Sequence, residues 1–522
     1  MKANPLTQAI VAGICAAATT LPVAAMNLNP LGTGQVLIYP YYTVSAGNQT
    51  LISVVNRTDT GKAVKVRFRE GRNARIALEF NLYLSPFDVW VASAFAYSDT
   101  PPNNPANLIT LDNSCTVPRI KGNTALPALS NGARYASFSN YSYSGSNDDA
   151  GANTLDRNRE GYFEMIEMGE VGNRDRNSLA AITHGATGVP ANCLQVERAW
   201  LPAGFASETT AYWTTNALVD LTPPKGGLFG TASIIDALAG TMMSYNAEAI
   251  DAFSDIVQHL LPGSGQPTLA SARSNADSAI AYVFDDGALV TSSYPLSRAI
   301  DAVSALFVQD DLLNEFVTNP SVGGATEWVV TLPTKYAYTD QAMVGSTAIA
   351  PFTRIFPATA SSQNSGTSAA DIREVIFNRE EGPNASFCND PLFCFPFPGQ
   401  PIPPPPQWFW ASNVISFNQA NAAVSGSNIL GSRQVVDLPV ADLGVFDGWL
   451  KVALYSATNA AEDSLIDRQR LRPDQSGGIW NGLPVIGFQA SSYTNGQLVP
   501  GVLSNYASIQ KHRGGNRYVA RP

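Results

Sequence analysis

Residues 50–95 carry the pattern that most constrains this fold, a series of short β-like runs in which residues 63–69 alternate strictly between apolar and polar side chains and residues 76–84 repeat that pattern. A period of two is that of a β-strand with one buried face, because successive side chains point to opposite sides. Turn-forming residues at 56–62 and 71–73 divide the run into strands. Strands this closely spaced, with no helix between them, cannot be parallel neighbours. The pattern therefore predicts four strands in an antiparallel meander, as one sheet of a sandwich.

The same register predicts which of these side chains reach the core. A slip by one residue would exchange the two faces, so the assignments are tested as a set. For the polar side, a solvated face is favoured over a ligand surface. Phe80→Ala is expected to cost about 3 to 5 kcal/mol, whereas Lys65→Ala is expected to stay within about 0.5 kcal/mol. The residues expected to be buried are Val64, Val66, Phe68, Leu78, Phe80 and Leu82, and those expected to be exposed are Lys65, Arg67 and Glu79.

The composition favours a β-rich extracellular protein. Of the 522 residues, 45% are hydrophobic and only 14% are charged, against about a quarter in typical globular domains. A formal net charge of −10 opposes binding to nucleic acid, whose phosphates attract basic proteins. We therefore expect no nucleic-acid partner. The expected fold is mostly β, an antiparallel β-sandwich with an immunoglobulin-like N-terminal part, long loop insertions and one or two helices.

Changes of pattern along the chain divide it into six segments. A broad apolar stripe from Ile300 to Phe316, followed by Asn319-Pro320, predicts a helix over residues 297–316. The expected segments are a signal peptide at 1–25, immunoglobulin-like strands at 26–100, a loop-rich insertion with strands at 101–225, further strands plus the helix at 226–357, a Ser/Ala- and Pro-rich linker region at 358–407, and C-terminal strands at 408–522.

The first 25 residues have the pattern of a secretory signal. Lys2 gives a short positive region, an apolar stretch follows, and Val23-Ala24-Ala25 offers small residues at a cleavage site. Cleavage there would leave Met26 first. Lipidation at Cys15 is an alternative, which Ile14 before it disfavours. No later segment has about 20 uninterrupted apolar residues, so no transmembrane segment is expected after signal removal, and the protein is expected in the periplasm or at the cell surface.

The cysteines are expected to form disulfides. Without Cys15, the four that remain allow three pairings. Cys388 and Cys394 flank a turn-prone NDPLF loop, and Cys115 and Cys193 would then bridge the ends of a long insertion. A metal site is the alternative, but the three His are not at metal-ligand spacing to these cysteines, so no metal is expected.

Motifs for catalysis or cofactor binding do not occur in the sequence. It holds no G-x-S-x-G, H-E-x-x-H, P-loop or C-x-x-C-H, and no G-x-G-x-x-G after a strand, so no catalytic or cofactor residue is assigned. A triad assembled in space around one of the His is a minor alternative. Strict alternation would place Glu164 and Glu170 on one face of a strand and Glu167 on the other, which gives no acid/base pair.

Two further groups of residues allow binding functions. The oxygen-rich loop at 147–158 could hold Ca²⁺, although a solvated polar loop is favoured because the match to a calcium loop is poor. Aromatic residues are plentiful near the C-terminal strands and could stack on sugars if they are exposed. Alternation puts Trp408 and Trp410 on one face and Phe409 on the other, so at least one set belongs to the core. The other aromatic residues of this group are Trp449 and Trp480, later in the chain.

Six motifs together, GTGQVLIYPYYTV, LISVVN, AVKVRFREGRN, FNLYLSPFDVW, TEWVVTLPTK and GLPVIGF, span most of the chain after residue 25. In these motifs the chain resembles a group of secreted β-rich proteins of Gram-negative bacteria, a resemblance that brings no assigned activity. The strand–turn–strand at 51–68 also looks like bacterial immunoglobulin-like surface modules, at the level of fold alone. We therefore expect a non-catalytic exported structural or adhesive protein of the cell surface or periplasm. The alternative is a carbohydrate-binding or carbohydrate-degrading protein; candidate partners are cell-surface glycans or other surface proteins.

Overall fold

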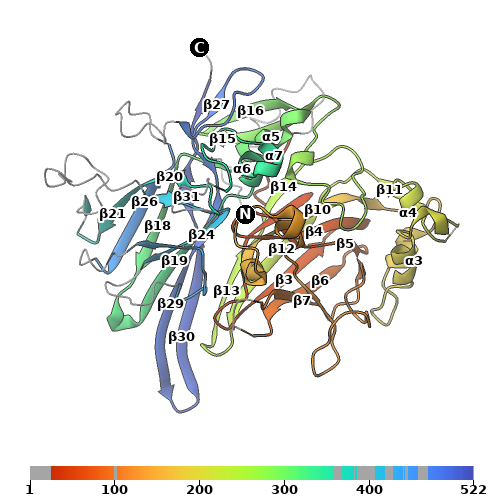
Figure 1. Cartoon of the computed structure of the whole chain (residues 1–522), viewed down its shortest axis with the longest axis horizontal. Helices are drawn as coiled ribbons and strands as arrows, with labels where there is room; N and C mark the ends of the chain where they lie inside the picture. The colour runs from red at the N-terminus through yellow and green to blue at the C-terminus, as the bar shows by residue number, and fades with distance from the viewer. Residues whose placement is uncertain are drawn as a thin grey trace, which may run out of the picture.

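The structure, a computed structural model, is mostly β, with 45% of residues in strands and 13% in helices. It describes residues 25–98, 103–207, 209–357, 366–380, 383–384, 406–417, 427–438, 440, 445–455 and 468–520. The signal at 1–24 and both Cys388 and Cys394 lie outside these residues. In Figure 1 the N-terminal sheets lie on the right, the C-terminal sheets on the left, and α5, β15 and β16 above the junction.

The N-terminal half contains two antiparallel sheets. In the first, an eight-stranded sheet, β10 lies between β2 and β4, although β2 and β4 precede it by a long stretch of chain. Its order is β1 (Asn27–Leu28), β14 (Glu248–Asp251), β2 (Val36–Thr43), β10 (Glu160–Val171), β4 (Gly61–Glu70), β5 (Ile76–Leu84) and β8 (Cys115–Val117), with β11 (Leu221–Thr222) paired to β10.

The second sheet has six strands and shares a core with the first. Its order is β13 (Thr241–Asn246), β12 (Leu228–Asp236), β3 (Asn48–Asn56), β6 (Val89–Ala96), β7 (Ala106–Ile109) and β9 (Tyr135–Ser137). One apolar cluster contains inward side chains of both sheets, among them Phe80 and Trp90, whose rings lie 5.8 Å apart.

The four strands predicted in residues 50–95 all form, but the meander is wrong. β4 and β5 pair in the eight-stranded sheet, whereas β3 and β6 pair in the six-stranded sheet. The chain therefore crosses between the two layers before β4 and after β5. The Asn56 side chain joins both crossings, because its amide donates to the carbonyls of Thr60 at 2.7 Å and Ser85 at 2.8 Å.

The predicted apolar face is confirmed by the structure. Val64, Val66, Phe68, Phe80 and Leu82 are buried, and Leu78 is half-buried against the same cluster. Phe68 and Leu78 are paired directly across β4 and β5, as expected from a turn at residues 71–73.

The predicted exposure of the polar face is wrong. The side chains of Lys65 and Arg67 are fully buried, and that of Glu79 is 4% exposed. The reason is that the eight-stranded sheet is covered on both faces. Residues near 260–267 lie over the charged side, where Lys65 Nζ donates to the Leu261 carbonyl at 3.0 Å and Arg67 Nη1 to the Pro267 carbonyl at 2.8 Å.

The charged side chains pair with one another inside this second face. We call Lys65, Arg67, Arg69, Glu79 and Glu164 the charged layer. Arg67 contacts Glu79 and Glu164, both at 2.7 Å, and Arg69 contacts Glu164 at 3.1 Å. Such pairing offsets the large cost of removing charges from water. The Arg69 guanidinium also lies 4.2 Å from the centre of the Tyr336 ring.

The C-terminal half contains two five-stranded sheets. One has the order β22 (Pro383–Asn384), β21 (Arg373–Asn378), β26 (Asp447–Ala453), β18 (Asp311–Val317) and β31 (Arg513–Gly515). The other has the order β25 (Val435–Leu438), β24 (Ser412–Phe417), β19 (Gly324–Thr331), β29 (Ile486–Val499) and β30 (Val502–Lys511). β24 and β25 pair in parallel, unlike the antiparallel pairs elsewhere in these two sheets. The β29–β30 hairpin extends beside β13 at the bottom of Figure 1.

Short pairs and helices complete the fold. The strand pairs are β15 (Ser278–Asp285) with β16 (Ala288–Pro295), β17 (Val308–Gln309) with β28 (Leu483–Pro484), β20 (Ala370–Asp371) with β23 (Gln407–Trp408), and β27 (Ile479–Trp480) with β32 (Tyr518–Val519). The α-helices are α2 (Ser178–Ile182), α3 (Cys193–Arg198), α4 (Tyr212–Thr215), α5 (Ala299–Ala305), α6 (Tyr336–Thr339) and α7 (Gln341–Val344).

The helix predicted over residues 297–316 is wrong in extent. Only α5 is α-helical, and β18 occupies Asp311–Val317. Within β18, Leu312, Asn314 and Phe316 are buried and alternate with more exposed residues, which is the period of a strand. The apolar residues of this short stretch fit a helical stripe and an alternating strand equally well, so periodicity alone could not separate them.

The segments expected from the sequence do not pack as separate units. β10, β12, β13 and β14, which follow residue 100, complete the two sheets that begin in residues 26–100. A second apolar cluster joins Ile38 and Ile166 of the eight-stranded sheet to Trp328 and Leu450 of the C-terminal sheets. The two halves therefore share one core.

Candidate functional site

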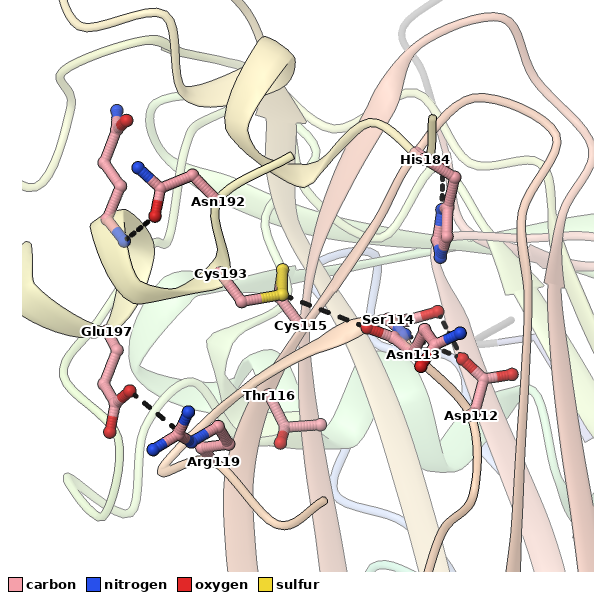
Figure 2. Close-up of a disulfide and its surroundings, with 12 residues drawn as sticks. Asp112, Asn113, Ser114, Cys115, Thr116, Arg119, His184, Asn192, Cys193 and Glu197 are labelled. Atoms are coloured by element: carbon pink, nitrogen blue, oxygen red, sulfur yellow. Dashed lines mark hydrogen bonds and ion pairs between the residues drawn. A yellow bond between two sulfur atoms is a disulfide. The ribbon is translucent and has the colours of Figure 1, made fainter. Parts of the chain in front are cut away.

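The disulfide predicted between Cys115 and Cys193 is formed, with the two Cα atoms 5.2 Å apart (Figure 2). It attaches α3 to β8 at the edge of the eight-stranded sheet. The Asn192 side chain caps α3 by accepting from the Gln195 amide at 3.2 Å. The second predicted pair, Cys388 with Cys394, lies outside the described residues.

A serine, a histidine and an aspartate meet near this disulfide, but not as a catalytic triad. The Ser85 hydroxyl lies 2.9 Å from His184 Nδ1, and the Asp88 carboxylate lies 3.6 Å from the same nitrogen. In a triad the serine and the aspartate bind opposite nitrogens of the ring. Asp88 also accepts from the Ser85 amide at 3.0 Å, which makes it the cap of a turn.

The arrangement expected for the three glutamates of β10 is wrong. A β-bulge between Glu167 and Gly169 shifts the register, so Glu167 and Glu170 both contact Lys62 Nζ at 2.9 Å. Glu164 points to the opposite face, into the charged layer. Burial raises the pKa of Glu167 to about 7 despite the ion pair with Lys62. These carboxylates are occupied by ion pairs within the fold.

Side chains of the oxygen-rich loop at 147–158 form hydrogen bonds and ion pairs with one another and with the turn after β4. The Asp149 carboxylate accepts from Arg157 at 2.6 and 2.8 Å and from the Asn73 amide at 3.0 Å. Arg157 in turn contacts Glu70 at 2.8 Å, which fixes the turn after β4. The solvated loop favoured from the sequence is therefore wrong at Asp149, which is 6% exposed. Within the described residues, no three His, Cys, Asp or Glu side chains are grouped as metal ligands.

A concave surface lies on the outer face of the sheet β21–β26–β18–β31. It is an open groove of about 1080 Å³. Outward side chains of three adjacent strands form its floor, because Glu315, Trp449 and Phe377 are direct cross-strand neighbours in the ladder. Leu313, Val317, Asn319, Asn378, Arg379, Asp447 and Arg513 surround them.

Two aromatic rings dominate the groove. Phe377 and Trp449 stack with ring centres 4.1 Å apart and planes 7° apart, and the Trp449 residue remains 38% exposed. The close approach of β21 and β26 requires glycine beside the pair, since a Cβ atom on Gly448 would collide with the Phe377 carbonyl oxygen. The stack is therefore positioned by strand pairing rather than by a loop.

Both signs of charge border the aromatic pair. Asp447 lies 3.7 Å from the Arg379 guanidinium and accepts from the Asn319 amide at 3.4 Å. The Arg379 side chain is 72% exposed, so it can bind a ligand without losing a buried partner. Glu315 and Arg513 are also exposed. The groove thus combines an apolar ring surface with accessible hydrogen-bonding groups, as ligand sites commonly do.

The other aromatic residues singled out in the sequence belong mainly to the core. Trp408 and Trp480 are fully buried, and Phe409 and Trp410 are half-buried against each other at 5.5 Å. Of this set, Trp449 alone is exposed. Phe377 and the charged border were missed, because their proximity to Trp449 depends on pairing between strands distant in sequence.

Comparison with known proteins leaves the groove as the main guide to function. No protein-family model matches the chain, and no curated protein or solved structure shows significant similarity to it. Among the described residues, no helix is both long enough and apolar enough to cross a membrane.

Proposed function

We propose that this chain is a non-catalytic exported protein of the bacterial cell surface or periplasm, with a structural or adhesive role, that binds its partner through the C-terminal groove. The observation that carries the proposal is the Phe377–Trp449 stack on the floor of an open groove, in which the Trp449 ring is exposed. Export is supported by the signal-like residues 1–25 and by the Cys115–Cys193 disulfide, because disulfides persist in oxidising compartments.

The immunoglobulin-like kinship of the N-terminal strands belongs to the same proposal. It is supported by the division of β3 to β6 between two sheets that share a core. The resemblance to secreted β-rich proteins of Gram-negative bacteria also belongs to this proposal. Under this proposal the ionised residues of the interior maintain the fold, and recognition occurs on the exposed faces of sheets.

A glycan is the partner class that the groove favours, which makes carbohydrate binding the second candidate function. The C–H faces of a sugar ring pack on aromatic rings, while its hydroxyls bond to carboxylates, amides and guanidinium groups. Trp449 offers the first kind of contact, and Arg379, Asp447 and Asn319 offer the second. A carbohydrate-degrading variant of this function would need two carboxylates across the bound sugar; Glu315 and Asp447 are the carboxylates that line the groove.

The test is binding of the chain without residues 1–25 to intact bacterial envelopes and to a glycan array. Trp449→Ala should abolish or strongly reduce binding in both assays, because it removes the exposed ring and leaves the paired strands beneath the groove in place. Phe284→Ala is the matched control, since Phe284 is 70% exposed on the β15–β16 hairpin, outside the groove.

The outcomes separate the two candidate functions. Envelope binding that depends on Trp449, without binding to glycans, supports adhesion to a surface protein. Glycan binding that depends on Trp449 supports the second candidate. Release of reducing ends from a bound glycan, lost in Glu315→Gln, would instead assign degradation. Equal binding by Trp449→Ala and the unsubstituted chain would reject the groove as the binding surface.

A further inference from the structure

The side chains of the C-terminal groove lie in three rows across the sheet. Outward residues of β18 are two positions apart, so neighbouring rows are separated by about 6.7 Å along the strand. A ligand that follows β18 from the first row to the third therefore crosses about 13 Å of the groove. The rows, in order, are Leu313 with Arg513, then Glu315 with Trp449 and Phe377, then Val317 with Asp447 and the adjacent Arg379.

The three rows offer different contacts. The middle row presents the exposed Trp449 ring, on which the C–H face of a sugar can pack. Each outer row carries an exposed arginine, Arg513 in the first and Arg379 in the third, and Asp447 adds a carboxylate beside Arg379. Guanidinium groups donate hydrogen bonds to sugar hydroxyls, and carboxylates accept from them. A single ring stacked on Trp449 lies between the outer rows and leaves most of their polar groups in water, whereas a chain of three rings contacts every row.

The charges of the groove favour an uncharged ligand. In the described part of the chain, the charged side chains that line the groove are Glu315, Asp447, Arg379 and Arg513, two of each sign. They offer no excess of positive charge that would hold an acidic glycan. The chain as a whole has a formal net charge of −10 and repels polyanions. An uncharged glycan meets no such repulsion and can bond to acidic and basic groups alike.

We propose that the groove binds an uncharged oligosaccharide of at least three sugar units, laid along β18 with its middle unit stacked on Trp449. Arg513 and Arg379 bond to the two flanking units and set the minimum length. The inference rests on the carbohydrate binding put forward above as the second candidate function, and it adds the length and the charge of the glycan.

The first measurement uses the chain without residues 1–25 on a glycan array that holds uncharged and acidic glycans of increasing length. The bound glycans should be uncharged chains of three or more units, and single sugars should bind far more weakly. Binding should be the same at about 50 and 500 mM NaCl, because salt screens only the attraction between charged groups.

The second measurement is calorimetry of a trisaccharide that the array selects and of the disaccharide contained in it. The trisaccharide should bind more tightly. Arg513→Gln and Arg379→Gln should each weaken its binding by about threefold to tenfold, the effect of losing one hydrogen bond, and should reduce its advantage over the disaccharide. Arg57→Gln is the control, since Arg57 is exposed between β3 and β4, outside the groove.

The outcomes separate this inference from the proposed function. Binding to acidic glycans alone, binding that weakens with salt, or equal affinity for a single sugar and a trisaccharide would overturn the inference and leave carbohydrate binding in place. Equal effects of the Arg513 and Arg57 substitutions would overturn the role of the outer rows in setting the length. Envelope binding that depends on Trp449, with no glycan bound, would overturn the inference together with the second candidate function but would support adhesion to a surface protein. Binding that Trp449→Ala leaves unchanged would reject the groove itself.

Discussion

The two sheets of the N-terminal half each pack one face into a shared core, and their other faces differ. In the eight-stranded sheet the other face carries the charged layer and is buried under residues near 260–267. In the six-stranded sheet it carries aliphatic and hydroxyl side chains, with Val91 46% exposed. The usual preference, with charge outside and apolar groups inside, is inverted between these two faces.

This contrast shows what each face has to satisfy. A buried face of charges is tolerated only when every charge finds a partner, so its geometry is demanding. An exposed face of uncharged groups has no such requirement, because its side chains remain in contact with water. The first face thus depends on pairing within the chain, whereas substitutions on the second should cost little.

The largest expected effect is at the centre of the charged layer. Arg67→Ala should lower the free energy of unfolding by about 3 to 5 kcal/mol, because Glu79 and Glu164 lose a buried partner. Urea denaturation followed by circular dichroism would measure it. Phe80→Ala, in the apolar core, should cost a similar amount.

Lys225→Ala is the control for Arg67→Ala, since the Lys225 side chain is 73% exposed and Glu170, which it contacts at 3.4 Å, keeps its ion pair with Lys62. It should change stability by less than about 1 kcal/mol. Equal effects of the Arg67 and Lys225 substitutions would mean that the charged layer is hydrated rather than buried.

A smaller loss is expected at Lys65, where burial replaces the solvent exposure predicted from the sequence. Lys65→Ala should cost about 1 to 3 kcal/mol rather than 0.5, because Glu79 loses a contact at 3.2 Å and the Leu261 carbonyl loses its donor. Thermal unfolding of the two proteins side by side would measure the difference. An effect within about 0.5 kcal/mol would restore the prediction of a solvated face.

The charged layer should also make the free energy of unfolding depend on pH, with a loss of stability in acid. Burial alone would raise the pKa of Glu79, but Arg67 and Lys65 hold it below its ordinary value of 4.5. The contribution of Glu79 is therefore present above about pH 4.5 and is lost as the pH falls through the lower folded-state pKa. Denaturation of the unsubstituted chain and Glu79→Gln from pH 6 to about 2.5 should show their difference shrinking with acid. A difference that is constant over this range would contradict the ion pairs.

The smallest effect is expected on the exposed, uncharged face of the six-stranded sheet. Val91→Thr should change stability by at most about 0.5 kcal/mol, because its new hydroxyl reaches water. The same substitution at Val66, which is fully buried, should cost about 1 to 3 kcal/mol because the hydroxyl has no partner there. Chemical denaturation of the two variants measures the effect of the same Val→Thr change on the free energy of unfolding at an exposed and at a buried position. Comparable losses would show that the outer face is covered within one chain.

The alternation in residues 50–95 was enough to predict the inner face, including Phe68 and Leu78 as neighbours. It could not predict that the opposite face is buried, because the residues that cover it lie some two hundred positions later, in a stretch without periodicity. Cys115–Cys193 was predictable once export was assumed, because the turn-prone loop between Cys388 and Cys394 suggested that pair and left Cys115 and Cys193 for each other. Of the groove, Trp449 was recognised as a candidate, whereas the neighbouring Phe377 depends on the register of β21 against β26.

The position of β10 between β2 and β4 has a consequence for the order in which the chain can fold. During synthesis β2 and β4 appear first and remain with open hydrogen-bonding edges until β10 has been made. Pairings between such distant segments close long loops and form slowly, which prolongs the interval in which a chain can aggregate. A fragment that ends before Glu160 should therefore behave as an aggregation-prone intermediate rather than as a smaller domain. A chain that begins to fold only after its whole N-terminal half has been made would avoid that state.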